Sequence, residues 1–375
     1  MGDILSDWTN LSFANVATTS PAAHNASLAW SDALARGGAA EFDGEAEKNG
    51  MLPLRQATSR LLSCGVEDVC VGSSATELLC SIAWAVWPEK GSNVVSTRSS
   101  FPSTVYPWSR VAESSGAEIR LAEHDSNLYT NPKDILELID ESTSVVTLSH
   151  IEFSNGQRYD IEKFAKAAHS VGAILVIDAT QSMGMFPIDA PSCGADVIVS
   201  SGYKWLRGTY GAAVGYISPS VRSNLNPGLV GFRSHADIWD LRADRMELPE
   251  DASKFEYTTI HFGAALGLAA AVEEICEIGI EEVWKRDLIL AEAVVNGANH
   301  LGIGVVSPMS TEERSAIVSL RLPDEVSSEV VAKRLQDEYS ILVTSRSGFL
   351  RVSPHIDNSV EQVNSLISAL EEILN

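Results

Sequence analysis

Seven short apolar segments constrain the fold of this 375-residue chain more than any other feature. They are rich in β-branched residues and apolar throughout, without alternation between apolar and polar positions. Such runs predict strands that are buried on both faces. The segments are Val69–Val71, Asn93–Thr97, Glu118–Ala122, Ser144–Ser149, Ile174–Ile177, Val197–Ser200 and Ala213–Ile217.

Helical patterns separate several of these strands, most clearly at Ala75–Val86, Pro132–Ile139 and Ile161–Val171. The alternation predicts an α/β fold, with a mostly parallel central sheet flanked by helices. Beyond a charged, weakly periodic loop over residues 235–255, the pattern predicts a smaller α+β unit. Its expected elements are helices Phe262–Glu277 and Ile280–Asn299, strand Ile317–Leu322, helix Ser328–Gln336, strands Ile341–Thr344 and Phe349–Ser353, and helix Val360–Ile373.

We therefore expect a large domain over residues 18–265 and a small domain formed by residues 1–17 and 266–375. The chain has 27 basic and 50 acidic residues, a formal charge of −23, and this acidity excludes nucleic acid and acidic membranes as expected partners. Five cysteines without a CxxC motif predict a reduced protein with no disulfide framework and no metal site. The N-terminus does not resemble a signal peptide, so we expect a cytoplasmic location.

Polar residues follow several predicted strands, where ligands bind in open α/β sheets. Gly72–Thr76 opens a helix and suits a phosphate, but taken alone it favours simple N-capping by Ser73 or Ser74, because it lacks GxGxxG or P-loop spacing. Asp178 ends an apolar strand, where a carboxylate needs a cationic partner or serves as a helix cap. Lys204 lies among aromatic residues, where an ammonium group either loses its charge and becomes a nucleophile or extends to solvent.

Together these three features match the needs of pyridoxal 5′-phosphate (PLP), which requires a phosphate anchor, a carboxylate at the pyridine nitrogen and a Schiff-base lysine. The stretches 176–181 (VIDATQ) and 196–206 (DVIVSSGYKWL) resemble the class V aminotransferase family of fold-type I PLP enzymes. That family includes cysteine desulfurases, isopenicillin N epimerase-like proteins and kynureninases. The resemblance continues through residues 15–19, 74–77, 107–108, 149–150 and 350–354, and so covers nearly the whole chain.

The resemblance implies cofactor roles for particular residues. Lys204 would hold PLP as a Schiff base, Asp178 would pair with the pyridinium nitrogen, and Gln181 would contact the phenolic oxygen. Phe101 would stack on the cofactor ring, and Thr259 would reach the phosphate of a neighbouring subunit, which implies a homodimer with shared sites. The implied phosphate ligands are Ser74, Ala75, Thr76, Ser201 and Tyr203.

The resemblance also implies that Arg351 binds the α-carboxylate of an amino acid substrate through its bidentate fork. Arg346 resembles part of a second substrate-side loop, and Asn155 is a further candidate contact. Cysteine desulfurases carry a catalytic cysteine shortly before the carboxylate arginine, whereas residues 345–351 read SRSGFLR. We therefore expect a C–S or other β-elimination lyase that does not form a persulfide on a cysteine.

Other functions stay open at this point. Lys204 as general base and Asp178 as partner of the ring would equally serve an epimerase or an aminotransferase, because all three reactions begin with loss of the α-proton. A non-catalytic protein of the same fold is a more remote alternative. A nucleotide-binding protein that uses Gly72–Thr76 would lack a P-loop or GxGxxG motif and would leave Lys204 unexplained.

Overall fold

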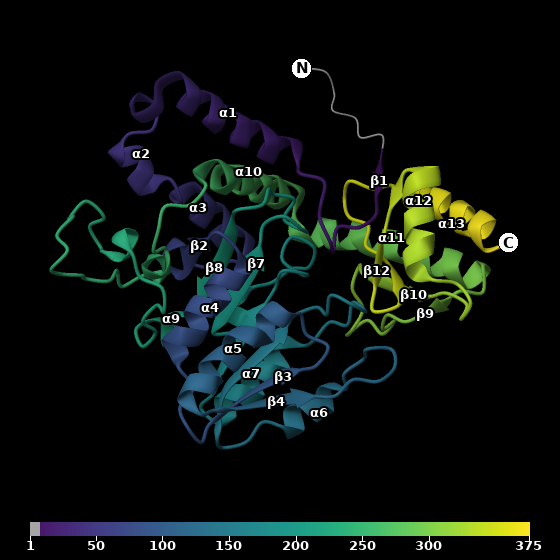
Figure 1. Ribbon diagram of the computed structural model, residues 1–375, viewed down its shortest axis with the longest axis horizontal. Helices are drawn as coiled ribbons and strands as arrows, with labels where there is room; N and C mark the ends of the chain where they lie inside the picture. Colours follow the sequence, from purple (N-terminus) through teal and green to yellow (C-terminus); the bar gives the residue numbers. More distant parts are fainter. Residues whose placement is uncertain (1–7) are drawn as a thin grey trace.

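The computed structural model describes residues 8–375, which form a larger and a smaller body connected through the long helix α11 (Ile280–His300). In Figure 1 the larger body holds the central sheet. The smaller body, to its right, holds the C-terminus together with the first described residues. The first and the last described residues therefore lie in the same body.

The central sheet has seven strands and is mixed. Only β8 runs antiparallel to its neighbours β2 and β7, and all other neighbouring pairs are parallel. This confirms the mostly parallel sheet predicted from the apolar runs. In spatial order the strands are β2 (Val69–Gly72), β8 (Ala213–Ile217), β7 (Val197–Ser201), β6 (Ile174–Asp178), β5 (Thr143–Ser149), β3 (Asn93–Thr97) and β4 (Glu118–Ala122).

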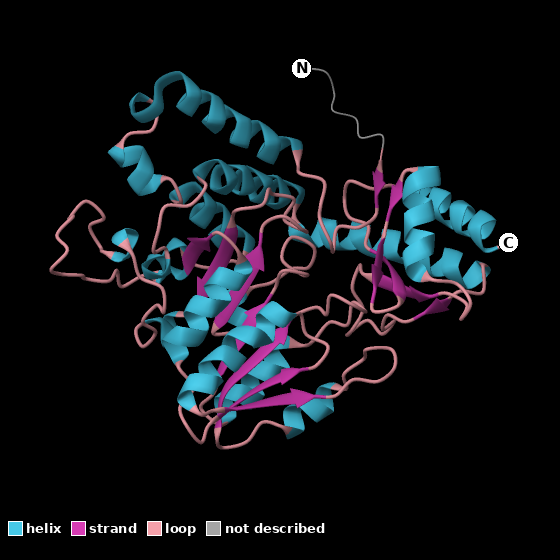
Figure 2. Cartoon of the chain, in the orientation of Figure 1, coloured by secondary structure: helices cyan, strands magenta, loops and turns pink. Residues whose placement is uncertain are grey.

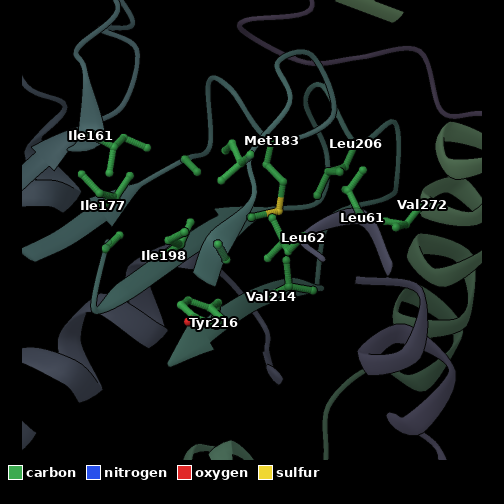
Figure 3. Close-up of a cluster of buried hydrophobic side chains, with 14 of the residues drawn as sticks. Leu61, Leu62, Ile161, Ile177, Met183, Ile198, Leu206, Val214, Tyr216 and Val272 are labelled. Atoms are coloured by element: carbon green, nitrogen blue, oxygen red, sulfur yellow. The ribbon is translucent and has the colours of Figure 1, made fainter. Parts of the chain in front are cut away.

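Both faces of the central strands are buried, which explains why apolar residues occupy consecutive positions in strands such as β6 and β7. Successive residues of a strand point to opposite faces, so Val145 and Val146 enter different cores. One core lies beneath α3 (Leu52–Leu61), α7 (Ile161–Ser170) and α10 (Phe262–Ile278), and Figure 3 shows part of it. The other lies beneath α4 (Ala75–Val86) and α5 (Pro102–Ser115).

The other helices of the larger body are peripheral, and α1 packs along α10. They are α1 (Pro21–Gly37), α2 (Gly44–Asn49), α6 (Pro132–Glu137), α8 (Ala190–Cys193) and α9 (Pro219–Arg222). The charged segment 235–255 contains one 3₁₀ turn, Ala252–Phe255, and otherwise no regular structure, as predicted. It is part of the long loop that extends from the body in Figure 2.

The smaller body is built on an antiparallel sheet. Its strands in spatial order are β12 (Thr344–Arg346), β13 (Phe349–Val352), β10 (Val318–Arg321) and β9 (Gly304–Val305). Helices α12 (Ser328–Tyr339) and α13 (Val360–Leu374) pack beside it. A separate parallel pair, β1 (Thr9–Asn10) with β11 (Ile341–Leu342), ties the N-terminal segment to this body.

Two details differ from the sequence-based expectation. The strand expected over Ile341–Thr344 is divided, because β11 pairs with β1 while β12 pairs with β13. The domain boundary expected after residue 265 falls inside α10, whose buried residues belong to the larger core as far as Ile275. The two cores meet within α11, where Val283 packs with the larger body and Leu290 with the smaller.

Across residues 8–375, no helix combines the length and apolar character that a bilayer crossing requires. In the same range, no three His, Cys, Asp or Glu side chains lie close enough together to hold a metal ion.

Candidate active site

One pocket lies where the carboxyl ends of β5, β6 and β7 meet the N-termini of α4 and α5, the edge at which open α/β sheets bind ligands. Eight of the residues singled out in the sequence line it, and five others join them. The predicted ones are Ala75, Thr76, Phe101, Asp178, Gln181, Ser201, Tyr203 and Lys204, and the additional ones are Ser103, Ser149, Ile151, Phe153 and Thr180.

Lys204 is the central cation of this pocket. Its side chain is buried, and its ammonium group makes no hydrogen bond or ion pair with any described residue. The Nζ atom lies 5.6 Å from the ring centre of Phe101 and 5.8 Å from that of Tyr203. Burial lowers the pKa of Lys204 to about 8; Asp178 opposes this change, while Arg351 and Arg346 add to it. Near neutral pH a fraction of the amine is therefore unprotonated and nucleophilic.

Asp178 is held at the end of β6 by two hydroxyl-bearing residues. Its Oδ2 accepts a hydrogen bond from Thr104 Oγ1 at 3.2 Å, and its Oδ1 accepts one from the Thr180 backbone N–H at 2.9 Å. The carboxylate is buried, and these bonds fix its direction. It is therefore oriented to accept a further hydrogen bond from a cationic ring N–H in the pocket.

The N-terminus of α4 forms one end of the pocket. Ser74 caps the helix by accepting from the Glu77 backbone N–H at 3.2 Å, as the capping interpretation predicts, and it does not line the pocket. The Ala75 backbone N–H donates to Ser201 Oγ at 3.3 Å, and Thr76 Oγ1 contacts Ser103 Oγ at 2.8 Å. Hydroxyl groups around an open helix N-terminus form a site suited to a phosphate.

Gln181 lines the pocket, but protein groups already engage its side-chain amide. Its Oε1 accepts from the Trp205 indole N–H at 2.8 Å, and its Nε2 donates to the Ala14 carbonyl at 2.9 Å. One amide hydrogen is left for a ligand. Gln181 therefore connects the pocket floor to the N-terminal segment as well as facing the pocket.

Arg351 lies on β13, beside the pocket wall formed by Phe153. It is 1% exposed, and its Nη1 donates to the Phe153 carbonyl at 2.5 Å. Its Nε and Nη2 are buried without any partner among the described residues. Burial, with a contribution from Arg346, lowers the pKa of Arg351 to about 9. A buried guanidinium with two free N–H groups and no carboxylate is suited to bind an anionic ligand.

Besides Ser74 and Arg351, the structure places three further predicted residues outside the pocket lining. Arg346 donates from Nη2 to Asn15 Oδ1 at 2.9 Å and acts on the site through its charge. Asn155 is fully buried, donates to the Leu128 carbonyl at 2.9 Å and accepts from the Gln157 N–H, so it holds a loop and does not face the pocket. Thr259 is exposed and contacts Glu47 Oε1 at 3.4 Å.

Sequence reasoning missed several residues in or beside the pocket. Thr104 lies beside the lining, in the first turn of α5, and Thr180 lies in the lining, two residues after Asp178. Phe153 presents its ring to Phe101 at 5.3 Å in an edge-to-face contact. Their position directly after strands was a usable signal for Thr180 and Phe153, whereas no pattern in the sequence indicates that Thr104 reaches Asp178.

The sequence model of the aminotransferase class-V family matches residues 19–366. The chain belongs to the aminotransferase class-V family. Among curated class-V relatives, a probable cysteine desulfurase of Pyrococcus abyssi is 28% identical over 299 residues, covering 76% of this chain and 73% of that protein. A cysteine desulfurase of Haloferax volcanii is 27% identical over 329 residues, covering 82% of this chain and 75% of that protein.

Solved structures confirm the fold-type I architecture of this class-V protein. The apo cysteine desulfurase from Thermococcus onnurineus NA1 superposes with a TM-score of 0.87 at 23% identity, covering 98% of this chain and 95% of that chain. A cystine C–S lyase in complex with its product, cysteine persulfide, superposes with a TM-score of 0.89 at 20% identity, covering 98% of both chains. The large and small bodies described above are therefore those of a known enzyme fold.

Proposed function

We propose that this chain is a PLP-dependent lyase that cleaves a C–S bond, or another bond to a β-substituent, in an amino acid. The observation that carries the proposal is the placement of Lys204. It is buried in the same pocket as Asp178, and its pKa is influenced by the partly unpartnered guanidinium of Arg351, which lies beside that pocket. A lysine and a carboxylate in one cavity, with an anion site beside it, are what PLP and an amino acid require.

The residues present fit the cofactor. Lys204 has a depressed pKa and no competing hydrogen bond, so it would carry PLP. Asp178, fixed by Thr104 and Thr180, would hold the proton on the pyridine nitrogen. The phosphate would lie at the start of α4, against the Ala75 N–H and the hydroxyl groups of Thr76 and Ser201. Phe101 and Tyr203 would bound the ring.

When bound, PLP supplies an electron sink for the negative charge that develops at the substrate α-carbon. Arg351 would bind the substrate carboxylate through its free Nε and Nη2 and so orient the α-proton. Lys204 Nζ would take that proton as general base and return it as general acid. Asp178 would stabilise the transition state by remaining ionised against the ring N–H.

Several observations support a mechanism without a persulfide-forming cysteine. Arg346 and Phe349 are joined by a tight turn at Ser347 and Gly348, both with positive φ, so the segment before Arg351 is short and contains no cysteine. All five cysteines are free thiols, and none lines the pocket within residues 8–375. Burial raises the pKa of every one of them, which disfavours the reactive thiolate.

The proposal includes a homodimeric enzyme in a reducing, cytoplasmic setting. Thr259 is exposed and makes one weak contact within its own chain, and Tyr210, stacked on Tyr203 at 4.2 Å, is 62% exposed beside the pocket. Both are available to a second copy. Analytical ultracentrifugation would give a dimer mass if the proposal holds, and a monomer at micromolar concentration would contradict it.

The reaction type is tested with PLP-loaded protein in D2O and a panel of L- and D-amino acids that includes cysteine, cystine and cysteine conjugates. We expect release of the sulfur-bearing fragment, with formation of pyruvate, detected by mass spectrometry. Intact substrate with α-deuterium and mixed chirality would instead establish an epimerase. A keto acid formed together with aminated cofactor would establish an aminotransferase. The Lys204→Ala variant is the control for reactions that PLP carries out without Lys204.

A further inference from the structure

A fully buried acid–base pair lies behind the Lys204 segment, outside the pocket. His355 Nδ1 is 2.7 Å from Asp287 Oδ2, and both side chains are completely buried. The other ring nitrogen, Nε2, is 3.1 Å from the backbone carbonyl oxygen of Trp205. Asp287 comes from α11, His355 from the turn after β13, and Trp205 directly follows Lys204.

This geometry fixes the number of protons that the pair holds. The Trp205 carbonyl can only accept, so His355 Nε2 must carry a hydrogen. A second proton lies between Nδ1 and Asp287 Oδ2. The pair therefore has no net charge in either form, imidazolium with carboxylate or imidazole with carboxylic acid. Burial raises the pKa of Asp287 to about 6, although His355 favours its ionised form, and Asp287 Oδ1 has no partner among the described residues.

Trp205 is held on two sides by these contacts. Its carbonyl accepts from His355, its ring meets the His355 ring edge-on at 5.1 Å, and its indole N–H donates to Gln181 at 2.8 Å. The carbonyl of Lys204 accepts from the Arg207 N–H at 2.8 Å, which closes a tight turn around Trp205. A histidine of the smaller body thereby fixes the backbone next to Lys204.

The same histidine is close in sequence to the anion-binding arginine. Arg351 lies in β13, and the chain leaves that strand to reach His355 through the buried Ser353, whose N–H donates to Leu11. A continuous, rigid path therefore joins Arg351 to Lys204 through His355 and Trp205. It crosses from the smaller body to the larger one.

We propose that the Asp287–His355 pair is a positioning element that sets the Lys204 segment in register with Arg351. This inference rests on the proposed role of Lys204 as the PLP-bearing residue. The pair touches neither cofactor nor substrate. It acts by holding the Trp205 carbonyl and so fixes the distance between the Lys204 amine and the Arg351 guanidinium.

A second ion cluster on the same turn provides a matched control. Asp357 pairs with Arg207 at 2.7 Å, and Arg207 also reaches Glu274 at 3.3 Å. Asp357 and Arg207 also influence the pKa of Asp287. Asp357 lies two residues after His355, and its carboxylate bonds to the Arg207 side chain and not to Trp205. Asp357→Asn therefore removes an acid from the same turn and leaves the contact between His355 and the Trp205 carbonyl in place.

The test uses PLP-loaded wild type, Asp287→Asn, His355→Gln and Asp357→Asn. For each we would measure the pH titration of the visible absorbance of bound PLP, the rate of PLP release, the melting temperature, and kcat and KM. Asp287→Asn and His355→Gln should shift the absorbance midpoint by about 0.5–1 pH unit, a change in the environment of the Lys204 nitrogen. A misplaced lysine should also lower kcat by about tenfold or more, with KM nearly unchanged.

Because removing one member of a buried pair can unfold a protein, the double variant Asp287→Leu/His355→Phe replaces both charges with apolar groups, a change that is often tolerated. It should fold and show the same absorbance shift. Unchanged midpoints and kcat in the double variant, or an equal shift in Asp357→Asn, would overturn the inference. Failure of the proposed function has its own readout, which is borohydride treatment of the wild-type protein. If that treatment leaves no PLP adduct on Lys204, the proposed function and the inference that rests on it are both overturned.

Discussion

The site has two walls: the pocket lining, which belongs to the larger body, and Arg351, which lies beside that lining on the smaller body. The two walls differ in how their polar groups are satisfied. On the larger body, Asp178 is bonded to Thr104 and Thr180, and the amide of Gln181 is bonded to Trp205 and Ala14. On the smaller body, Arg351 leaves two buried N–H groups without partners and has no carboxylate beside it. The first wall is complete in itself, whereas the second carries positive charge that a ligand must neutralise.

This difference indicates which wall serves the resident cofactor and which serves a transient ligand. Groups that meet the same molecule permanently can be fixed by hydrogen bonds within the protein. A site that must bind and release substrate gains affinity when its donors are buried but free. Lys204 lies between the two walls, and its pKa responds to both, because Asp178 raises it while Arg351 and Arg346 lower it.

Lys204→Ala is expected to give the largest effect, because it removes the proposed base and the attachment point of PLP. Turnover of any substrate should fall by about 10²–10⁴-fold or more. Folding should persist, since the side chain of Lys204 makes no hydrogen bond with the described residues. Circular dichroism and melting would verify the fold. If the Lys204→Ala enzyme stayed active, Lys204 would not be the base, and another residue would have to take the α-proton.

Arg351→Met separates the two walls. Loss of two charge-assisted hydrogen bonds to the substrate carboxylate should lower kcat/KM by about 10²–10⁴-fold, since each is worth about 1.5–3 kcal/mol. The free energy of unfolding without ligand should not fall, because an uncompensated buried charge is removed. The control is Arg207→Met, which breaks a buried arginine paired with Asp357 and Glu274, and should lose about 1–2 kcal/mol. Equal destabilisation by both variants would contradict the comparison.

Glu152→Gln tests whether a buried carboxyl group of the larger body is protonated in the folded protein. Glu152 is fully buried and accepts hydrogen bonds from Thr97 and Ser100, both at 3.1 Å, while its Oε2 has no partner. Burial raises the pKa of Glu152 from 4.5 to about 7, so the folded state binds its proton more tightly than the unfolded state. Its contribution to stability is complete below pH 4.5 and is lost as the pH rises through 7.

The stability of Glu152→Gln relative to wild type should therefore increase by about 3 kcal/mol between pH 4.5 and pH 8, since one pKa unit corresponds to about 1.4 kcal/mol. Urea unfolding at a series of pH values measures this difference. A difference independent of pH would show that Glu152 is already ionised in the folded protein. Glu45→Gln, on the exposed face of α2, is the control for general charge effects.

The fold and the large-body half of the site could be predicted because both depend on short-range patterns. Apolar runs such as Val197–Ser200 identify buried strands, and ligand groups in this fold class follow strand ends. Arg351 came from family resemblance alone. The role of Asn155 could not be judged from sequence, because its contacts with Leu128 and Gln157 depend on a loop conformation. The Asp287–His355 pair is far apart in sequence and forms only when α11 crosses between the bodies.

Arg346→Gln should have the smallest effect on the site. It tests how much the positive charge of the smaller body contributes to the pKa of Lys204. Arg346 lowers the pKa of Lys204 less than Arg351 does and bonds only to Asn15 among the described residues. Removing its charge should move the pKa of Lys204 upward from about 8, so that less of the amine is neutral at pH 7.5. The rate of PLP loading onto cofactor-free protein, followed by absorbance against pH, should show a midpoint displaced to higher pH.

Asp178→Asn should displace the same midpoint in the opposite direction and by more, because Asp178 has the larger influence on the pKa of Lys204. If both variants moved the midpoint the same way, the loading rate would report access to the pocket and not the ionisation of Lys204.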